Sequence, residues 1–206
     1  AALDTQPTGD VTIGLSSSDE TEGTVSPSSL TFTNANWSTT QTVTVTGVDD
    51  YADDGDITYS IVTAVAVSSD FRYSGLNPPD VSVTNTDDDA AGITFSATSG
   101  LTTTEAGGTA SFTAVLNSQP TGDAAFDLTS YDLTEGTVYP ASLTFTSADW
   151  STAQTVTLTG VDDIDDDGDI AYSVITGAVT STDSDYNGVN PSDISLTNLD
   201  NDAGTI

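Results

Sequence analysis

Residues 154–169 read Gln-Thr-Val-Thr-Leu-Thr-Gly-Val-Asp-Asp-Ile-Asp-Asp-Asp-Gly-Asp. In the first half of this stretch apolar residues alternate with threonines, so Val156 and Leu158 would point to one face of a strand and the threonines to the other. Such alternation is typical of a β-strand that is buried on one side and solvated on the other. Six aspartates then crowd into the following connection. The stretch predicts a sheet protein that collects its carboxylates where strands end.

The sequence repeats itself with a period of 113 residues. Residues 3–93 align with residues 116–206 without a gap, and about 55 of the 91 pairs are identical. Trp37-Ser38-Thr39, for example, falls on Trp150-Ser151-Thr152. We therefore expect two copies of one structural module.

The phase of the repeat sets the expected domain boundaries. Residues 94–113 have no counterpart ahead of Ala1, whereas Ala203-Gly204-Thr205-Ile206 resembles the start of a copy at residues 90–93. We expect residues 1–89 to form a sandwich that lacks its first strand or strands. Residues 90–206 should form a complete sandwich plus the start of a next repeat. This phase is typical of a slice through a longer tandem array.

The complete copy contains seven segments with period-two alternation, separated by clusters of Gly, Pro, Asn and Asp. The expected strands are 92–98, 109–117, 123–130, 142–146, 153–161, 170–180 and 193–199. About seven short strands in roughly 110 residues predict an all-β fold, with tandem immunoglobulin-like Greek-key β-sandwiches. The alternative of disorder, which high net charge favours, is opposed by a hydrophobic content of 35% arranged in these alternating runs.

Composition excludes several classes of function. The chain has 32 Asp and Glu residues against one basic residue, Arg72, for a formal net charge of -31, and it contains no His or Cys. Without His, Cys or Lys there can be no Ser-His dyad, cysteine nucleophile, Schiff base or ordinary zinc site, so we expect no enzyme. A chain this acidic has little to neutralise phosphate, so we expect no nucleic-acid partner and no binding to an anionic membrane. No stretch is long and apolar enough for a membrane span.

The acidic connections need neutralising, because carboxylates a few ångströms apart repel by about 1 kcal/mol per pair even in water. Oxygen-rich clusters suit a hard cation, and Ca²⁺ suits them better than Mg²⁺, which tends to keep its water. The alternative is that these loops are simply solvated, but their recurrence in both copies disfavours it. An EF-hand is a poor match, since Val174 stands where its closing Glu would be and strands flank the loop.

The residue order also resembles a known family. Thr104-Glu105-Ala106-Gly107-Gly108, then Asp132, then an Asp-rich loop after a Thr-Val-Thr strand, then terminal acids before Ala-Gly-Ile-Thr-Phe, is similar to a Calx-β domain. That sandwich occurs in the regulatory region of sodium–calcium exchangers and in many bacterial surface proteins. The resemblance implies a Ca²⁺ cofactor. In the second copy it implies the ligands Glu105, Asp132, Asp162, Asp163, Asp166, Asp167, Asp200 and Asp202. In the first copy it implies Asp19, Asp49, Asp50, Asp53, Asp54, Asp87, Asp88 and Asp89.

These observations favour a calcium-stabilised structural repeat of a secreted bacterial adhesin or extracellular filament, at the cell surface or outside the cell. The alternative is a carbohydrate- or ice-binding sandwich, for which Trp37 and Trp150 or the threonine runs would be the surface; a structural role for both features is favoured. The expected partners are neighbouring copies of the repeat, joined head to tail as an extended rod through the short acidic connection 87–91. A preceding module or a neighbouring chain would complete the sheet edge of the first copy.

Arg72 is the only site for trypsin, which cuts after Lys or Arg. If calcium holds the fold, the calcium-bound protein should stay whole in trypsin, whereas chelator should allow one cut and give two fragments on a denaturing gel. Rapid cleavage in the presence of calcium would instead place Arg72 in a mobile loop and contradict the rigid-rod interpretation.

Overall fold

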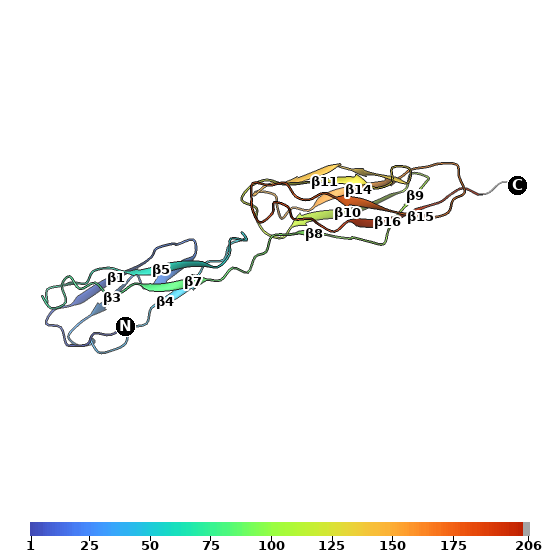
Figure 1. Cartoon of the computed structure of the whole chain (residues 1–206). Helices are drawn as coiled ribbons and strands as arrows, with labels where there is room; N and C mark the ends of the chain where they lie inside the picture. The colour runs from blue at the N-terminus through green and yellow to red at the C-terminus, as the bar shows by residue number, and fades with distance from the viewer. Residues whose placement is uncertain (204–206) are drawn as a thin grey trace. The chain divides into compact units, whose positions relative to one another are not determined.

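The computed structural model describes residues 1–203, and all its regular elements are β-strands (Figure 1). The chain divides into two compact units. The first comprises Ala1–Asp50 and Asp54–Asp87, and the second comprises Tyr51–Asp53 and the chain from Asp88 onward. Across residues 1–203 there is no helix with the length and apolar character needed to span a membrane.

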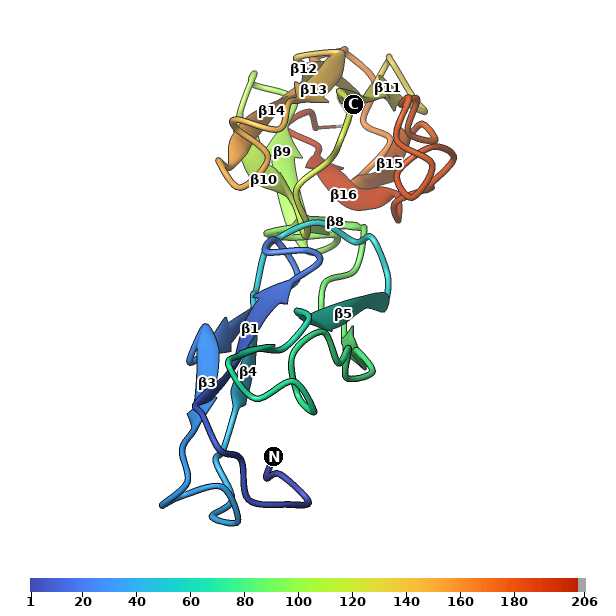
Figure 2. The ribbon, with the colours of Figure 1, turned by 90° about the vertical axis from the view of Figure 1, so that its left-hand side faces the viewer.

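The second unit contains two sheets (Figure 2, nearly end-on). The four-stranded sheet has the order β12-β14-β10-β8, with bounds Gly136–Tyr139, Gln154–Gly160, Thr109–Leu116 and Ile93–Phe95. The five-stranded sheet has the order β13-β11-β15-β16-β9, with bounds Ser142–Phe145, Ala124–Ser130, Ile170–Thr176, Ile194–Leu199 and Leu101–Thr104. From β10 to β15 each strand lies in the sheet opposite its predecessor, as expected of a Greek-key sandwich.

The core of the second unit lies between these sheets. Phe112 on β10 and Val156 and Leu158 on β14 face inward from one sheet and are fully buried. Phe126 on β11 faces inward from the other, and its ring lies 6.2 Å from that of Phe95 in an edge-on contact. The period-two pattern of each strand thus produces one apolar face, and the two faces pack against each other.

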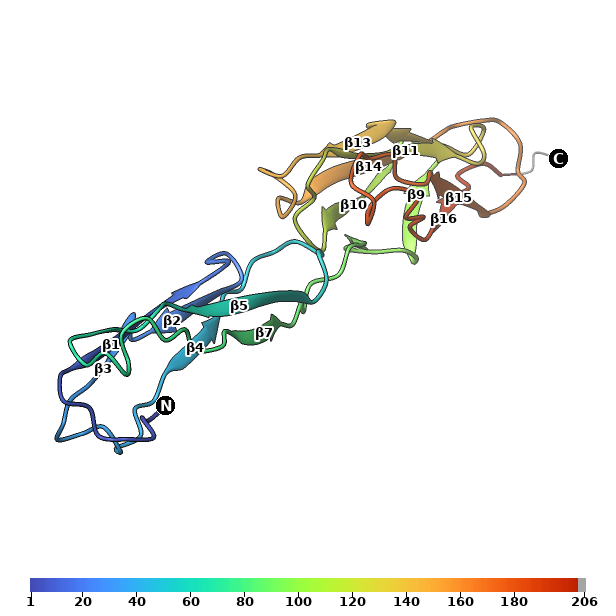
Figure 3. The same cartoon turned by 60° about the vertical axis from the view of Figure 1, so that its left-hand side comes forward.

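The first unit repeats much of this architecture (Figure 3). One sheet has the order β3-β1-β5-β7, with bounds Ser29–Phe32, Val11–Ser17, Ile57–Thr63 and Val81–Asn85, and the short β6, Val67–Ser68, also pairs with β1. The second sheet has two strands, β2 and β4, with bounds Gly23–Ser26 and Thr44–Gly47. Strands β1, β2, β3 and β5 begin and end 113 residues before β11, β12, β13 and β15.

The all-β, immunoglobulin-like sandwich predicted from the sequence is confirmed, and each of the seven expected strands of the second copy is present with slightly shorter bounds. The sequence analysis missed β9 and β12, which are four residues long. In so short a segment alternation carries little signal. In addition β9 follows Gly100, whose φ of 74° turns the chain away from β8, so that β9 pairs in parallel with β16 in the opposite sheet. The expected start of a further repeat falls on Ala203 and on residues 204–206, which lie outside the described residues.

In each unit a tyrosine hydroxyl forms hydrogen bonds with the backbone of a residue that is distant in the sequence. In the second unit the Tyr186 hydroxyl accepts a hydrogen bond from the Ser118 N–H at 3.0 Å and donates one to the Ser118 carbonyl at 2.7 Å, and both residues are buried. In the first unit Tyr73 makes the equivalent pair of bonds to Thr5, which is exposed. The same interaction therefore occurs once away from water and once in contact with it.

Replacing each tyrosine by phenylalanine should reveal this difference. Tyr186→Phe leaves a buried backbone N–H and C=O without partners, and should lower the free energy of unfolding of the second unit by about 1–3 kcal/mol. Tyr73→Phe should cost the first unit clearly less, because water replaces the lost partner. Urea unfolding followed by tryptophan fluorescence measures both, with Trp37→Phe leaving Trp150 as reporter of the second unit and Trp150→Phe leaving Trp37 for the first. Equal losses would show that burial does not set the strength of this contact.

Candidate metal centre

The acids of the second unit gather at one end of the sandwich, in the connection after β14 and at the end of β16. Glu135, Asp163 and Asp167 each place a carboxylate oxygen within 4.8 Å of the others. Glu105, Asp200 and Asp202 form a second group by the same measure. Both glutamates are buried.

Hydrogen bonds from the backbone hold the second group in place. One carboxylate oxygen of Asp200 accepts the Gly168 N–H at 2.8 Å, and the other accepts the Asp202 N–H at 2.6 Å. The Asp200 N–H in turn donates to Asp169 at 3.2 Å. Gly168 has a φ of 78°, a conformation that glycine adopts without steric cost. The acidic connection is therefore fastened to the end of β16 by main-chain donors.

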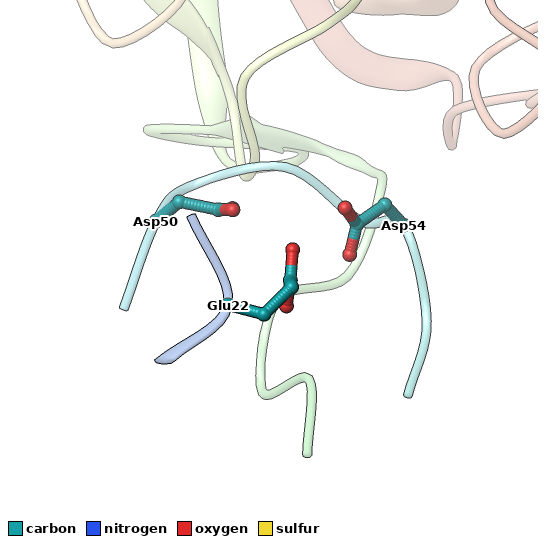
Figure 4. Close-up of side chains that lie close together, drawn as sticks. All are labelled: Glu22, Asp50 and Asp54. Atoms are coloured by element: carbon teal, nitrogen blue, oxygen red, sulfur yellow. The ribbon is translucent and has the colours of Figure 1, made fainter. Parts of the chain in front are cut away.

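The first unit builds the first group again. Glu22, Asp50 and Asp54 lie 113 residues before Glu135, Asp163 and Asp167, and their carboxylates point toward one another (Figure 4). Asp87 accepts hydrogen bonds from the N–H groups of Asp54 and Gly55, as Asp200 does from Gly168. The same acids thus take the same arrangement in two copies of the module.

Burial and the neighbouring negative charges both disfavour the ionised form of the Glu135 group. Burial raises the pKa of Glu135; the hydrogen bond from Asn198 acts against it, and the charges of Asp167, Asp132 and Asp163 raise the pKa further. Burial also raises the pKa of Asp167, with added repulsion from Asp163 and Asp200. In the absence of a cation this group therefore disfavours full ionisation.

In the second group, too, burial and neighbouring negative charges disfavour the ionised form of the carboxylates. The hydrogen bond from the Asn201 N–H lowers the pKa of Glu105, but burial and the charges of Asp200 and Asp163 outweigh it, so the pKa is raised. Burial raises the pKa of Asp202, helped by the charges of Asp200 and three other aspartates. The buried Oδ2 of Asp202 has no hydrogen-bond partner among residues 1–203. A buried carboxylate oxygen without a donor, facing other carboxylates, fits a position beside a cation.

This donor set suits one kind of metal. Each group offers carboxylate oxygens alone, without nitrogen or sulfur, and this chemistry favours a hard divalent cation. Loops and strand ends, rather than a rigid octahedral cage, provide the oxygens, and such a frame accommodates the 6–8 ligands that Ca²⁺ takes.

The structure places the predicted ligands in three ways. Five predicted ligands belong to the three-acid groups of the second unit: Glu105, Asp163, Asp167, Asp200 and Asp202. Two belong to the three-acid group of the first unit, Asp50 and Asp54. Asp162 accepts a hydrogen bond from the Asn201 amide, Asp166 raises the pKa of Asp202 by its charge, and Asp87 fastens the loop of the first unit. Asp49 and Asp88 are exposed and Asp53 and Asp89 half-buried, and none of these four joins a group within one compact unit.

Asp19 and Asp132 lie outside the three-acid groups. Each accepts hydrogen bonds from the N–H and hydroxyl of the threonine two residues later, and these bonds lower the pKa of both carboxylates. They are therefore engaged in their own turns. The glutamates three residues further on, Glu22 and Glu135, complete the groups instead.

Glu22 and Glu135 were missed in the sequence analysis, although a signal for them exists. The chain has four glutamates, and these two stand at equivalent positions of the repeat, each followed by Gly-Thr-Val. The glycine is required because a Cβ at Gly136 would collide with the Tyr172 ring. A glutamate that is identical in both copies and precedes such a glycine therefore lies where the backbone passes close to the core.

Comparisons with known proteins give only weak structural similarity. No protein-family model matches the chain, and no curated protein does. Among solved structures, the calcium binding domain CBD12 of CALX1.1 is 16% identical, with a TM-score of 0.40, over 86% of this chain and 70% of that one. Domains 4 and 5 of the S-layer protein SbsC are 13% identical, with a TM-score of 0.38, over 91% and 75%. The periplasmic chaperone SfaE is 11% identical, with a TM-score of 0.42, over 55% of this chain and 61% of its own length.

Glu135→Gln should change both the pH dependence and the calcium response. A raised pKa means that the folded metal-free protein holds the Glu135 proton more tightly than the unfolded chain does, so this group adds stability as the pH falls from 7. The variant should therefore gain less melting temperature between pH 7 and pH 5 in chelator than the natural protein gains. It should also gain less from calcium at pH 7.

The control is Asp127→Asn, which removes an exposed carboxylate of β11 that belongs to neither group. This variant should match the natural protein in both measurements, made by differential scanning calorimetry. If Glu135→Gln also matched it, the Glu135 group would be neither strained by its charge nor a cation site.

Proposed function

We propose that the chain is a calcium-stabilised structural repeat of a secreted bacterial surface adhesin or extracellular filament, in which it serves as a rigid spacer or polymer unit. The observation that carries this proposal is the recurrence of one three-acid group in both units, on the same elements. If the acidic loops were only solvated, nothing would favour placing a buried glutamate beside two aspartates in both units.

Calcium is the cation that this arrangement supports best. Each three-acid group brings one carboxylate oxygen from each of its acids within 4.8 Å of the others. Extracellular calcium modules bind with dissociation constants of about 0.1–1 mM, so loops of this kind are filled where calcium is millimolar. This favours a location outside the cell.

A structural role fits the distribution of side chains. The core of each unit is apolar, and the three-acid groups lie in the connections at the strand ends. The two tryptophans do not make a sugar platform the better interpretation, because Trp150 is half-buried and packs against the apolar core of its sandwich. The repeat places Trp37 at the equivalent position of the first unit. The position of the tryptophans therefore favours the structural role over a carbohydrate-binding module.

Neighbouring copies of the repeat are the proposed partners. The two modules share one ligand arrangement, and an array of such modules would be acidic throughout. Cations at the module ends would then reduce the repulsion between neighbours. This part of the proposal rests on the repeat and on the position of the acids at the end of each sandwich.

Calcium should stabilise the folded protein strongly. An ion that binds only the folded state adds about 4 kcal/mol when its concentration is a thousand times the dissociation constant. The melting temperature in calcium should therefore exceed that in chelator by well over about ten degrees, because about 1 kcal/mol shifts a domain of this size by roughly 4–8 °C. Calorimetry in calcium, in magnesium and in chelator measures the difference.

Paired variants connect the effect to the acid groups. Asp163→Asn should weaken the calcium response of the second unit and Asp50→Asn that of the first, while Asp127→Asn should leave both unchanged. Coincident melting curves in calcium and chelator for the natural protein would show that the acidic connections are solvated loops and would refute the proposal.

A further inference from the structure

Aspartate is followed directly by glycine at two places in the chain, Asp54-Gly55 and Asp167-Gly168. The two junctions are 113 residues apart, so they occupy the same position of the repeat. Each lies in an acidic connection outside any strand, shortly ahead of β5 or β15. At such a junction the peptide nitrogen can approach the preceding side chain with little hindrance, because glycine has no Cβ.

Both junctions have room to change their conformation. Gly55 has a φ of 76° and Gly168 a φ of 78°. Apart from chain neighbours, no heavy atom among residues 1–203 lies within 4 Å of the position that a Cβ would take at either glycine. Asp54 and Asp167 are both exposed. Packing therefore does not prevent the aspartate side chain from turning toward the nitrogen that follows it.

The N–H of each glycine donates to a carboxylate. Gly168 donates to Asp200 at 2.8 Å, and Gly55 donates to Asp87 at 2.7 Å. A carboxylate at this distance is placed to take the proton when the nitrogen acts as a nucleophile. Each unit therefore combines an attacking nitrogen, a proton acceptor and an adjacent carboxyl group.

The junction Asn187-Gly188 provides a contrast within the same chain. Asparagine before glycine can close the same ring by losing ammonia, but here the Gly188 N–H donates to the backbone carbonyl of Val179 at 2.8 Å. The side-chain oxygen of Asn187 accepts the Ser181 N–H at 3.3 Å. A backbone carbonyl is a far weaker base than a carboxylate. The two Asp-Gly junctions thus differ from Asn187-Gly188 in having a base on the attacking nitrogen.

We propose that Asp54-Gly55 and Asp167-Gly168 are sites of spontaneous backbone modification, at which aspartate converts to isoaspartate when the acid group holds no cation. The Gly168 nitrogen attacks the side-chain carboxyl carbon of Asp167 and gives its proton to Asp200. A nitrogen–carbon bond forms and a carbon–oxygen bond breaks, with loss of water, to give a succinimide ring. Water then opens the ring at the main-chain carbonyl of Asp167. The main chain now runs through the former side chain and is longer by one carbon atom.

The control by a cation rests on the proposed function, whereas the junctions and their bases do not. The carboxylate of Asp167 lies within 4.8 Å of those of Glu135 and Asp163, and that of Asp54 points toward Glu22 (Figure 4). A cation bound in the group would hold this carboxylate among its neighbours and keep it ionised, and an ionised carboxylate is a poor electrophile. Without a cation, repulsion between the acids favours turning it away. A group left without its cation would then lose the ligand permanently.

The whole chain, kept for several weeks at neutral pH in chelator and below its melting temperature, tests the proposal. Labelling with an isoaspartyl methyltransferase, followed by peptide mass spectrometry, should find isoaspartate at Asp54 and Asp167 and not at aspartates followed by larger residues. In calcium at a thousandfold excess over the dissociation constant only about one group in a thousand is metal-free, so conversion should be at least about tenfold slower. Protein aged in chelator should also bind calcium more weakly than fresh protein.

Single substitutions of the bases locate the chemistry. Asp200→Asn keeps a side-chain oxygen that can accept the Gly168 N–H but removes the base, so in chelator it should slow conversion at Asp167 at least about tenfold. Asp54 in the same molecule is the internal control and should convert at its natural rate. Asp87→Asn should have the opposite pattern. Unchanged conversion at Asp167 in Asp200→Asn would contradict the proposal.

Deamidation of Asn187 in the same samples reports whether the fold stays intact. Its rate should be equal in calcium and in chelator. If it rises in chelator by the same factor as isoaspartate formation, unfolding causes both changes and the proposal is wrong.

Calorimetry of the same samples separates this inference from the proposed function. If calcium stabilises the protein but no isoaspartate forms in chelator, the inference fails and the proposed function stands. If isoaspartate forms equally in both conditions and calcium has no stabilising effect, the proposed function fails, and the control by a cation is lost with it.

Discussion

Negative charge has to stay out of the sandwich interior, and the whole design of the molecule follows from this constraint. With 32 carboxylates and one basic residue, the chain cannot neutralise its acids with its own cations. The strands consequently alternate apolar residues with Thr and Ser rather than with charged pairs. The acids are displaced to the connections, where they crowd. The arrangement that protects the core thus creates the clusters at its end, and burial of Glu105 and Glu135 makes the clusters of the second unit costly to ionise unless a cation is present.

Backbone N–H groups take over the role that basic side chains play in other proteins. Asp70 and Asp183 show this directly, because they occupy equivalent positions. Asp70 accepts the Thr8 N–H at 2.9 Å and pairs with Arg72 at 2.6 Å, and its pKa is well below the ordinary value, mainly because of the Arg72 hydrogen bond. Asp183 lacks the arginine, since Asp185 stands there, yet it accepts the N–H groups of Thr121 and Asp185 and its pKa is also lowered despite burial. Main-chain donors, helped by the Thr121 hydroxyl, can therefore hold a carboxylate in its charged form without a basic side chain.

The sequence predicted the fold more completely than the site. Alternation in long strands such as β14, together with the 113-residue repeat, was enough to predict the all-β fold class. A strand with one fully apolar face must bury that face against another sheet. Alternation and the repeat were not enough for β9, whose position depends on a turn at Gly100 and on pairing with a strand almost a hundred residues away. In the site, the Asp-rich connections were visible as composition, but a carboxylate's role depends on which donors lie beside it. Asp132 was expected as a ligand and is held by Thr134, while Glu135, three residues later, reaches the cluster because β12 starts there.

The two copies also show which part of the module is self-sufficient. The half formed by β1, β3 and β5 keeps its core in both units, as Ile61 at 3% exposure and its counterpart Val174 at 0% demonstrate. The half around β4 and β7 does not, since Val81 is open where Ile194 is closed. In the second unit β14 and β16 each have neighbouring strands on both sides, and Val156 and Ile194 are fully buried there. The acid groups differ in this respect, because Glu22, Asp50 and Asp54 all come from one copy. Their arrangement is therefore set by the contacts within a single unit.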